Sequence, residues 1–466
     1  MHSVQEVDVA IIGAGTAGMA AYRGALARTP SVLLIEAEHY GTTCARVGCM
    51  PSKLLIAAAE AAHAVEGAWR FGAHTPGAAV VDGRAVMHRV RAERDRFVGF
   101  VLDTVEGFAP ENRLWGRARF LDHRTLEVRD DVGQVTQVRA GAVVIATGSR
   151  PQILPMFEGL GDRVVVNDDV FSWETLPRSV AVFGAGIIGL ELGQALHRLG
   201  VRVRIFGVRG NVGPLTDPVV RDAARDAFAA ELPLDVQSRV LSLRRHGEGV
   251  AVRFMQGEEE VEEHFELVLA ATGRAPNTHG LGLEHAGLAL DRRGVPLFDR
   301  RTMQCGDSSI FIAGDANADV PLLHEAADEG RIAGENAGSW PSVHAGSRRS
   351  VLAVVFTDPQ IAQIGQSWAE VKDQDPIIGR VSFDDQGRSR VMLVNRGRLH
   401  LYAARDTGRL LGAELVGPRA EHLAHLLAWS HQQGLTVVEM LAMPFYHPVV
   451  EEGLRTALRD AAAQLG

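Results

Sequence analysis

A glycine-rich turn between an apolar strand and a helix occurs twice in this chain. The first follows the strand Val7–Ile12 and the second follows Ser179–Phe183, each in the pattern G-x-G-x-x-G. The glycines of the two turns are Gly13, Gly15 and Gly18, and then Gly184, Gly186 and Gly189. In this context glycines let the backbone approach a pyrophosphate at the helix N-terminus, whereas the pattern alone also fits an ordinary tight turn. The recurrence predicts an α/β fold with two Rossmann-like dinucleotide-binding domains.

The first copy carries the acidic residue that such a site uses. Glu36 ends the next predicted strand, Ser31–Ile35, where a carboxylate accepts hydrogen bonds from ribose hydroxyls. Both copies end on Ala-Thr-Gly after an apolar strand, which supplies Thr147 and Gly148 in the first copy and Gly273 in the second. The first copy is the longer one, and the excess is an insertion that contains two cysteines.

Cys44 and Cys49 stand in the stretch Gly41–Lys53, which reads G-T-T-C-A-R-V-G-C-M-P-S-K. In a regular α-helix their side chains would point roughly 140° apart, which is wrong for a disulfide. Gly48 supplies the backbone freedom to bend the segment. An Ala-rich helix is predicted next, and a helix N-terminus favours the thiolate form of cysteine. The pair is either redox-active or two buried, inert thiols, and Cys305 is expected to be a small buried apolar residue.

The stretch resembles the redox-active segment of the flavin-dependent disulfide oxidoreductases, which include dihydrolipoamide dehydrogenase, glutathione reductase and mercuric reductase. Their usual form is G-G-T-C-x-x-x-G-C-x-P-S-K, from which only Thr42 departs, and the resemblance covers essentially the whole chain. It implies FAD in the first dinucleotide site and NAD or NADP in the second. It also implies a Cys44–Cys49 disulfide, in which Cys44 exchanges with substrate and Cys49 lies against the flavin. Lys53 and Glu191 match the family's ion pair beside the flavin.

The same resemblance implies further cofactor contacts. Ala118 stands in a G-x-A-x-F strand whose backbone meets the adenine, and Asp315 closes a strand in the second FAD fingerprint, where it binds the ribityl chain. His324 opens the next helix, whose positive end would stabilise negative charge on reduced flavin. The expected FAD residues are Gly13, Gly15, Gly18, Glu36, Thr43, Lys53, Ala118, Thr147, Gly148, Asp315 and His324. The expected NAD(P) residues are Gly184, Gly186, Gly189, Glu191, Arg209 and Gly273.

The choice between NAD and NADP rests on residues that disagree. Gly189 is typical of NAD-binding turns, where NADP-binding relatives more often carry alanine. The strand Arg202–Phe206 should be followed by an acid, as the first copy has Glu36, but Gly207 stands there. Arg209 lies close to where NADP-binding relatives keep an arginine for the 2′-phosphate, although a solvated loop arginine would look the same. The prediction is that strict NAD preference is lost and NADPH is used appreciably.

The stretch H-P-V-V-E-E that starts at His447 is similar to the H-P-x-x-x-E end of the family's dimerisation domain. It predicts that Pro448 begins a helix and that Glu452 orients the His447 imidazole for proton transfer. In the family, this histidine of one subunit completes the cysteine site of the other. Val449 and Glu451 depart from the usual H-P-T-x-S-E, and the role of the extra carboxylate at Glu451 is open. A surface histidine that caps a helix is the alternative interpretation.

The rest of the chain predicts structure without adding a site. A long helix is expected over 85–106, strands over 356–362, 397–403 and 410–416, and a helix over 420–433. The acidic run at 258–263 is expected to be the solvated rim of a hairpin. His422 and His425 lie three residues apart, as some metal ligands do. With no third ligand evident, a solvated face is favoured and no metal site is predicted.

At 466 residues the chain is too long for one ordinary core. The expected domains are an FAD domain over 1–150 with the redox segment inserted at about 41–106, an NAD(P) domain over 151–274, a central segment over 275–345 that completes the FAD domain, and an α+β dimerisation domain over 346–466. A net charge of −9 without a long basic run argues against nucleic acid and anionic membranes as partners. With no membrane-spanning run and no signal-peptide pattern, a cytoplasmic enzyme is expected, where close-spaced cysteines are more often catalytic.

The predicted function is that of a dihydrolipoamide dehydrogenase, a homodimer acting on a lipoyl-bearing protein or a small dithiol or disulfide. Ile187 follows the dehydrogenase pattern, where glutathione reductases tend to place tyrosine. The retained cysteine pair argues against soluble transhydrogenases, and the lack of a C-terminal cysteine pair argues against mercuric reductase. The rival within the class is an NAD(P)H-dependent reductase of another disulfide or a quinone. The rival outside the class is a flavoprotein scaffold or complex subunit without turnover.

Overall fold

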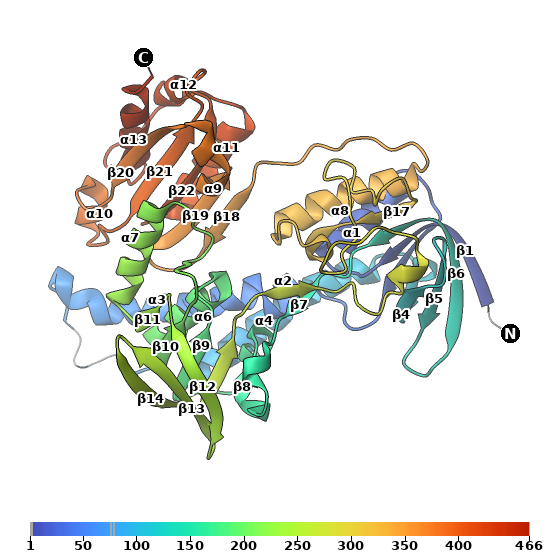
Figure 1. Cartoon of the computed structure of the whole chain (residues 1–466), viewed down its shortest axis with the longest axis horizontal. Coiled ribbons are helices and arrows are strands. Elements are labelled where there is room, and N and C mark those ends of the chain that lie inside the picture. Colours follow the sequence, from blue (N-terminus) through green and yellow to red (C-terminus); the bar gives the residue numbers. More distant parts are fainter. Residues whose placement is uncertain (1–2, 75–76, 78–79, 466) are drawn as a thin grey trace. The chain divides into compact units, whose positions relative to one another are not determined.

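The computed structural model describes residues 3–74, 77 and 80–465, which form two compact units (Figure 1). Unit 1 consists of Met1–Pro51, Ala92–Pro151 and Arg274–Arg349, and unit 2 of Ser52–Arg91, Gln152–Gly273 and Ser350–Gly466. Along the chain the units change close to the predicted limits 150, 274 and 345. The predicted insertion at about 41–106 is divided between them. Within the described residues, no helix has both the length and the apolar character needed to cross a membrane.

Unit 1 is built on a seven-stranded sheet in the order β3-β2-β1-β6-β5-β4, with β17 paired to β6. Its strands are β1 (Ser3–Ile12), β2 (Val32–Glu36), β3 (Arg113–Trp115), β4 (Arg117–Phe120), β5 (Thr125–Arg129), β6 (Val135–Ile145) and β17 (Ile310–Ile312). Strands β3, β2, β1, β6 and β17 run parallel, whereas β4 and β5 form an antiparallel extension. A separate antiparallel pair joins β7 (Ser149–Pro151) to β16 (Arg274–Pro276). The parallel part confirms the first predicted α/β domain.

Two helices of unit 1, α1 (Thr16–Leu26) and α8 (Leu323–Gly338), lie side by side (Figure 1). Glycines of α8 make their close approach possible. A Cβ atom added to Gly330 would lie 2.2 Å from the Ala17 carbonyl oxygen, and one added to Gly334 would lie 2.1 Å from that of Ala21. The pairs advance in the same direction along both helices, so α1 and α8 run parallel. Their N-termini therefore point the same way.

Unit 2 contains the second parallel sheet, in the order β11-β10-β9-β15-β8. Its strands are β8 (Val164–Val165), β9 (Ser179–Phe183), β10 (Arg202–Phe206), β11 (Leu234–Asp235) and β15 (Leu267–Ala270), and its helices are α5 (Asn167–Val170), α6 (Ile187–Arg198) and α7 (Pro218–Ala229). An antiparallel sheet of β12 (Arg239–His246), β13 (Gly249–Gln256) and β14 (Glu259–Phe265) accompanies it. The acidic run falls at the β13–β14 hairpin and is mostly exposed, as predicted.

The C-terminal part of unit 2 is an antiparallel sheet in the order β18-β19-β22-β21-β20, packed against helices α11 and α13. Its elements are β18 (Leu352–Val355), β19 (Gln360–Gly365), α9 (Trp368–Val371), β20 (Ile377–Ser382), α10 (Gly387–Val391), β21 (Arg398–Ala403), β22 (Leu410–Gly417), α11 (Ala420–Gln432), α12 (Val437–Leu441) and α13 (Glu452–Ala462). The predicted strand over 356–362 is wrong for its first half. Residues 356–359 form a loop, and the strand begins only at Gln360.

The described residues of the predicted redox insertion form three α-helices, α2 (Thr43–Val47), α3 (Cys49–Gly67) and α4 (Gly83–Glu106), and the 3-10 helix η1 (Ala68–Phe71). The predicted long helix over 85–106 is confirmed and starts two residues earlier. Helices α3 and α4 each have residues in both units, because the unit boundaries fall after Pro51 and after Arg91.

Candidate functional site

The first glycine turn is shaped by contacts that only glycine permits. Gly13 has a φ of +105°, and a Cβ atom there would lie 2.4 Å from the Ala146 carbonyl oxygen. A Cβ atom on Gly18 would lie 1.8 Å from the Gly13 carbonyl oxygen. The glycine turn therefore packs closely between the end of β6 and the first turn of α1. This packing places the Ala-Thr-Gly tripeptide that follows β6 beside the glycine turn.

Gly15 differs from its two neighbours because nothing lies within 4 Å of the position its Cβ would take. It is the N-cap of α1 and supplies no side-chain cap, so the helix N-terminus is open on that side. Glu36 closes the other side, because its Oε2 accepts a hydrogen bond of 2.8 Å from the Ala14 N–H. An open helix N-terminus with an ionisable acid at the end of β2 fits the pyrophosphate and ribose of a dinucleotide.

The second glycine turn repeats this geometry in unit 2. Gly184 has a φ of +120°, and its Cβ would lie 2.2 Å from the Ala271 carbonyl oxygen. A Cβ on Gly189 would lie 1.8 Å from the Gly184 carbonyl oxygen, whereas Gly186, the N-cap of α6, again has open space. The open N-terminus of α6 therefore also fits the pyrophosphate of a dinucleotide.

Gly207 takes the place of Glu36 in this second copy. Strand pairing aligns Phe183 with Phe206, and the Gly184 N–H donates to the Phe206 carbonyl at 2.8 Å, so the next residue is Gly207. A Cβ atom at Gly207 would lie 2.9 Å from the Ala185 Cβ. An acid at this position is therefore sterically opposed. Arg209 lies on the exposed loop that follows, with a φ of +60°.

Replacing Gly186 with alanine is expected to weaken nicotinamide nucleotide binding without weakening the fold. The residue has a φ of −81°, which alanine adopts freely, and the added methyl meets no protein atom within 4 Å. It would instead occupy the space beside the helix N-terminus. The Michaelis constant for NAD(P)H should rise by about tenfold or more. The midpoint of thermal unfolding should be unchanged.

Gly15→Ala is the matched control, because this residue has the same open space in the first turn. It should lower the flavin content of the purified protein and leave the Michaelis constant for NAD(P)H unchanged in the flavin-loaded fraction. The reverse pattern, with Gly186→Ala losing flavin, would show that the two sites are assigned the wrong way round.

Asp315 lies in the short 3-10 helix η6 (Gly314–Asn317) that follows β17. Its Oδ2 accepts a hydrogen bond of 2.7 Å from Ser149 Oγ. Arg274 donates to the same hydroxyl at 2.8 Å and to the Ser149 carbonyl at 2.7 Å. These contacts fix the Asp315 carboxylate at the edge of β7 and β16, and sequence reasoning identified neither Ser149 nor Arg274.

The remaining expected FAD residues of unit 1 lie on or directly after strands of the sheet, or on the helices α2 and α8. Thr147 Oγ1 donates to the Asn277 carbonyl at 2.7 Å, and Gly148 has a φ of +66°. Ala118 is buried on β4, and Thr43 is exposed at the start of α2. His324 lies in the first turn of α8, where its Nε2 is buried without a hydrogen-bond partner and burial lowers its pKa. A neutral imidazole with an unsatisfied buried nitrogen suits a polar ligand atom.

The cysteine segment bends at Gly48, as predicted. Helix α2 ends at Val47, and α3 begins at Cys49. A Cβ atom on Gly48 would lie 3.0 Å from the Thr43 carbonyl oxygen and 3.3 Å from the Cys44 Cα, so the chain folds back closely at this point. Thr42, the one departure from the family's usual segment, caps α2, because its hydroxyl accepts from the Ala45 N–H at 3.2 Å. Cys44 is half-buried and Cys49 exposed.

Lys53 and Glu191 form an ion pair within unit 2. The Lys53 Nζ lies 2.8 Å from Oε2 and 2.9 Å from Oε1 of Glu191, whose side chain is buried. Sequence reasoning missed a third member of this group. The Phe356 N–H donates to Glu191 Oε1 at 2.9 Å, and Lys53 Nζ lies 4.6 Å from the centre of the Phe356 ring. Phe356 stands in the stretch 356–362, which is predicted as a strand, and that pattern gives no signal of a contact with Glu191.

His447 and Glu452 are in contact, as predicted. His447 Nδ1 lies 3.0 Å from Glu452 Oε2, and the imidazole is 80% exposed. Because a carboxylate only accepts, Nδ1 carries the proton and Nε2 is left with its lone pair. Burial raises the pKa of Glu452, but hydrogen bonds from the Val449 N–H and His447, with the charge of Arg455, lower it overall. The carboxylate therefore stays ionised and orients the imidazole.

The helix predicted to begin at Pro448 is wrong. Helix α13 begins at Glu452, with Glu451 as its N-cap residue, and residues 448–451 form a turn. The turn is closed by hydrogen bonds from the Val449 N–H to the Glu452 carboxylate and from the Gly453 N–H to the Val450 carbonyl.

The two histidines of α11, His422 and His425, both contact Glu421 and not a shared metal position. His425 Nδ1 donates to the Glu421 carbonyl at 2.7 Å, and His422 Nε2 lies 3.6 Å from the Glu421 carboxylate. Among the described residues, no group of three or more histidine, cysteine and acidic side chains is placed to hold a metal.

These placements divide the expected residues between the units. The cysteines, Asp315 and the first glycine turn belong to unit 1. The Lys53–Glu191 pair, the second glycine turn, Gly273 and the His447–Glu452 pair belong to unit 2.

Two family models cover nearly the whole chain. The model of the pyridine nucleotide-disulphide oxidoreductases matches residues 7–330, and that of their dimerisation domain matches residues 351–458. Dihydrolipoyl dehydrogenase 2 of Haloarcula marismortui is 31% identical over 98% of this chain and 97% of its own length. Mercuric reductase of Acidithiobacillus ferrooxidans is 32% identical over 97% of this chain and 82% of its own.

Solved structures agree with these matches. LpdA from Mycobacterium tuberculosis superposes with a TM-score of 0.82 at 27% identity, over 97% of this chain and 99% of that one. The HOCl-induced flavoprotein disulfide reductase RclA from Escherichia coli, in its Cu(II) complex, gives a TM-score of 0.79 over 98% and 99% at 22% identity, which shows the fold alone. The chain belongs to the pyridine nucleotide-disulphide oxidoreductase family, whose enzymes use FAD and NAD(P)H.

Proposed function

We propose that this chain is a dihydrolipoamide dehydrogenase that binds FAD at the first glycine turn and NAD or NADP at the second, and works as a cytoplasmic homodimer. The observation that carries this proposal is the cysteine segment, which folds back at Gly48 and places Cys49 at the start of α3. The full-length similarity to dihydrolipoyl dehydrogenases and the dimerisation domain support it. A net charge of −9 is compatible with a protein or small-molecule partner and unfavourable for nucleic acid.

The proposed reaction begins with thiol–disulfide exchange. A thiolate of the substrate dithiol attacks Cys44 of the Cys44–Cys49 disulfide, so that a mixed disulfide forms and Cys49 leaves as a thiolate. The second substrate thiol then attacks the substrate sulfur of the mixed disulfide. The substrate leaves as its own disulfide, and Cys44 is released as a thiol. The substrate has been oxidised by two electrons and the enzyme disulfide reduced by two.

His447 is proposed to handle the protons of this exchange. Its Nε2 carries the lone pair, since Nδ1 donates to Glu452, so it can take the proton of a substrate thiol as the thiolate forms. Of the two protons that the substrate thiols lose, one ends on the departing Cys44 thiol and the other on His447 Nε2. In the proposed dimer, this imidazole comes from the partner subunit. Glu452 acts as a positioning residue, because it fixes the tautomer and the direction of the ring without touching substrate.

FAD, held at the first glycine turn, would supply the two-electron chemistry that connects the cysteine pair with NAD or NADP. The chain's own contribution on that side is the Lys53–Glu191 pair. Because the Glu191 carboxylate is buried and neutralised by Lys53, it holds the ammonium group in place through two hydrogen bonds. We assign the pair to setting the local electrostatics and not to acid–base catalysis.

A substrate panel tests the proposed function. Purified protein is assayed with lipoamide, glutathione disulfide and a quinone, each with NADH and with NADPH. Turnover of lipoamide far above the other two supports the proposal. Preference for glutathione disulfide or the quinone would identify a reductase of another kind, and no turnover with any acceptor would leave a scaffold or complex subunit.

The coenzyme preference depends on Arg209. The carboxylate that would bind the adenosine 2′-hydroxyl of NAD is replaced by Gly207, which also removes a repulsion against a 2′-phosphate. Arg209→Ala is therefore expected to raise the Michaelis constant for NADPH about tenfold and that for NADH much less, because each contact is worth on the order of 1–3 kcal/mol.

Arg202→Ala is the matched control, since this exposed arginine of β10 pairs with Glu263 on the hairpin sheet. It should leave both Michaelis constants unchanged. A wild-type preference for NADH of about a thousandfold that Arg209→Ala does not alter would refute the assignment. Gly207→Glu is a poor test of selectivity, because even a Cβ atom there meets Ala185 at 2.9 Å.

A further inference from the structure

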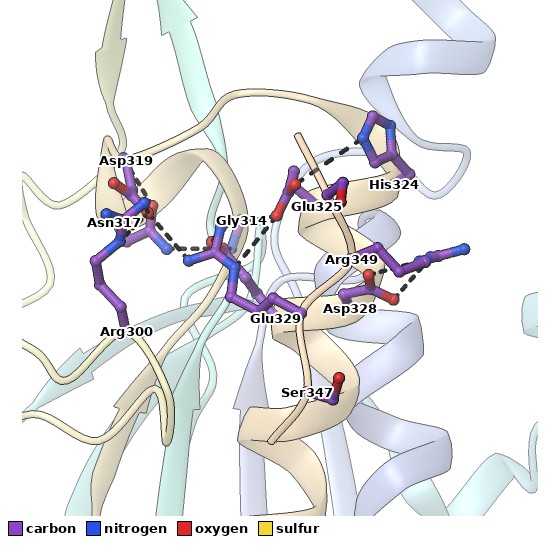
Figure 2. Close-up of polar contacts among 12 residues, drawn as sticks. Arg300, Gly314, Asn317, Asp319, His324, Glu325, Asp328, Glu329, Ser347 and Arg349 are labelled. Atoms are coloured by element: carbon purple, nitrogen blue, oxygen red, sulfur yellow. Dashed lines mark hydrogen bonds and ion pairs between the residues drawn. The ribbon is translucent and has the colours of Figure 1, made fainter. Parts of the chain in front are cut away.

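Glu329 is a carboxylate for which the proposed reaction has no use, yet it is fully buried on α8. Its Oε2 accepts hydrogen bonds of 2.8 Å from the Gly314 N–H and 2.7 Å from Asn317 Nδ2 (Figure 2). Both donors belong to the 3-10 helix η6, which carries Asp315. Glu329 therefore fastens the proposed FAD-binding turn to α8.

The other oxygen of Glu329 faces a cluster of charges. Arg348 Nη2 lies 2.9 Å from Oε1, at ion-pair distance but not aligned for a hydrogen bond, so this buried oxygen has no hydrogen-bond partner. The same guanidinium lies 2.7 Å from Glu325 and 3.1 Å from Asp319. Asp319 also pairs with Arg300 at 2.9 Å. Three carboxylates thus share two guanidinium groups.

The other charged groups nearby are already paired or sit at the margin of the cluster. Arg349 binds Asp328 at 2.7 Å, and His324 Nε2 is 4.0 Å from Glu325 Oε1 (Figure 2). On the α1 side, the residue against this part of α8 is Ala17, which is uncharged. Arg348 is thus the one cation within ion-pair distance of Glu329 among the described residues.

The charge state of Glu329 changes near neutral pH. Burial raises its pKa to about 7, against the lowering effects of Arg348, the Gly314 N–H and Asn317, while Asp319 raises it further. A carboxylate holds the two donors of η6 by charge-assisted hydrogen bonds, which are roughly twice as strong as those to a neutral acid. The turn is therefore held more firmly when Glu329 is ionised.

We propose that Glu329 is a positioning residue for FAD, whose ionised carboxylate holds the Gly314–Asn317 turn in place and whose charge is balanced by Arg348. Arg348 lies at the end of unit 1, directly before the chain enters the dimerisation domain. This inference rests on the proposed FAD site. It adds that FAD retention depends on pH through a residue that does not touch the flavin.

The test is the rate of FAD release from the holoenzyme, followed by flavin fluorescence across the pH range around 7. Wild-type protein should release FAD about tenfold faster on the acid side than on the alkaline side, since two charge-assisted hydrogen bonds weaken. Glu329→Gln keeps an oxygen for the Gly314 N–H and cannot ionise, so it should release FAD at the fast rate at every pH. Asp328→Asn is the matched control on the same helix, and its FAD release rate should change with pH as in wild type.

Arg348→Gln provides a second measurement if Glu329→Gln does not fold. Removing the cation raises the Glu329 pKa further, so the change in FAD release rate should occur at a higher pH. A purely structural role of Arg348 would not shift that pH. Two results would overturn this inference without touching the proposed cofactor. One is a normally flavinated Glu329→Gln protein whose FAD release rate still changes with pH as in wild type. The other is an Arg348→Gln protein in which that change occurs at the wild-type pH. Wild-type protein without flavin would overturn the cofactor proposal and this inference together.

Discussion

Cys44→Ser and Cys49→Ser are each expected to lower the turnover of lipoamide by about 10⁴-fold or more, because serine cannot form the disulfide that accepts the substrate's electrons. Both residues flank the bend at Gly48. The measurement is NAD(P)H-linked lipoamide turnover, with flavin content and thermal unfolding checked for each variant. Both variants should retain flavin, since neither cysteine stands in a glycine turn.

Cys305→Ala is the control for this pair. Cys305 is 1% exposed, and burial raises the pKa of its thiol to about 12, so it does not supply a thiolate at neutral pH. The variant should keep most of its turnover. A loss as large as that of Cys44→Ser, in protein that is folded and flavinated, would contradict the assignment of the redox pair.

The two serine variants also separate the roles of the cysteines. The family resemblance places Cys49 against the flavin, and in the chain by itself Cys49 is the more exposed of the two. A Cys49 thiolate beside oxidised flavin gives a long-wavelength absorbance band, so Cys44→Ser should show that band and Cys49→Ser should not. The opposite result would reverse the order of the two sulfurs.

The features that the sequence predicted correctly are those imposed by local sterics. At Gly18 and Gly189 a side chain would collide with the carbonyl oxygen of the residue five positions earlier, Gly13 or Gly184, at 1.8 Å in both cases, so glycine is required in both copies. Such a requirement is visible without knowing the rest of the fold, since the turn, strand and helix are contiguous. The bend at Gly48 is of the same kind.

Contacts between distant parts of the chain could not be predicted from residue patterns, and the family resemblance supplied only the Lys53–Glu191 pair and the His447–cysteine site. Phe356 donates to Glu191 and Gly330 packs on Ala17, but nothing in the sequence around either residue names its partner. Gly330, Gly334 and Gly338 recur every fourth residue, which suggests a helix face that approaches another closely. Only the structure identifies that neighbour as α1.

The error at Pro448 has a physical reason as well. Proline is favoured at the first position of a helix, and that preference predicted a start at Pro448. In the structure the Glu452 carboxylate accepts from the Val449 N–H, and this side-chain contact holds residues 448–451 as a turn ahead of α13. The predicted contact between His447 and Glu452 is nevertheless present, because it requires the turn at 448–451 and not a helix there.

His447→Gln is expected to lower lipoamide turnover by about 10²–10⁴-fold, the usual contribution of a positioned acid–base group. Glu452→Gln should lose a large part of the same activity, because an amide can donate to Nδ1 and so favours the tautomer with the proton on Nε2. Its pH–rate profile should change along with its maximal rate, which a loss of folding alone would not cause. Glu451→Gln is the matched control, since Glu451 is the adjacent carboxylate and stands at the N-cap position of α13 without a side-chain capping hydrogen bond. Equal losses from Glu451→Gln and Glu452→Gln would remove the orienting role assigned to Glu452.

Mixed dimers test whether His447 serves the cysteines of the other subunit. A dimer of one Cys44→Ser chain and one His447→Gln chain would contain one site with both changes and one site with neither, if each site combines Cys44 of one subunit with His447 of the other. Its activity should then be about half that of wild type, far above either parent homodimer. If each site is formed within one chain, every site of the mixed dimer carries one change and the activity stays at the parental level. The assay needs differently tagged chains, purification of the mixed species, and lipoamide turnover measured before the subunits exchange.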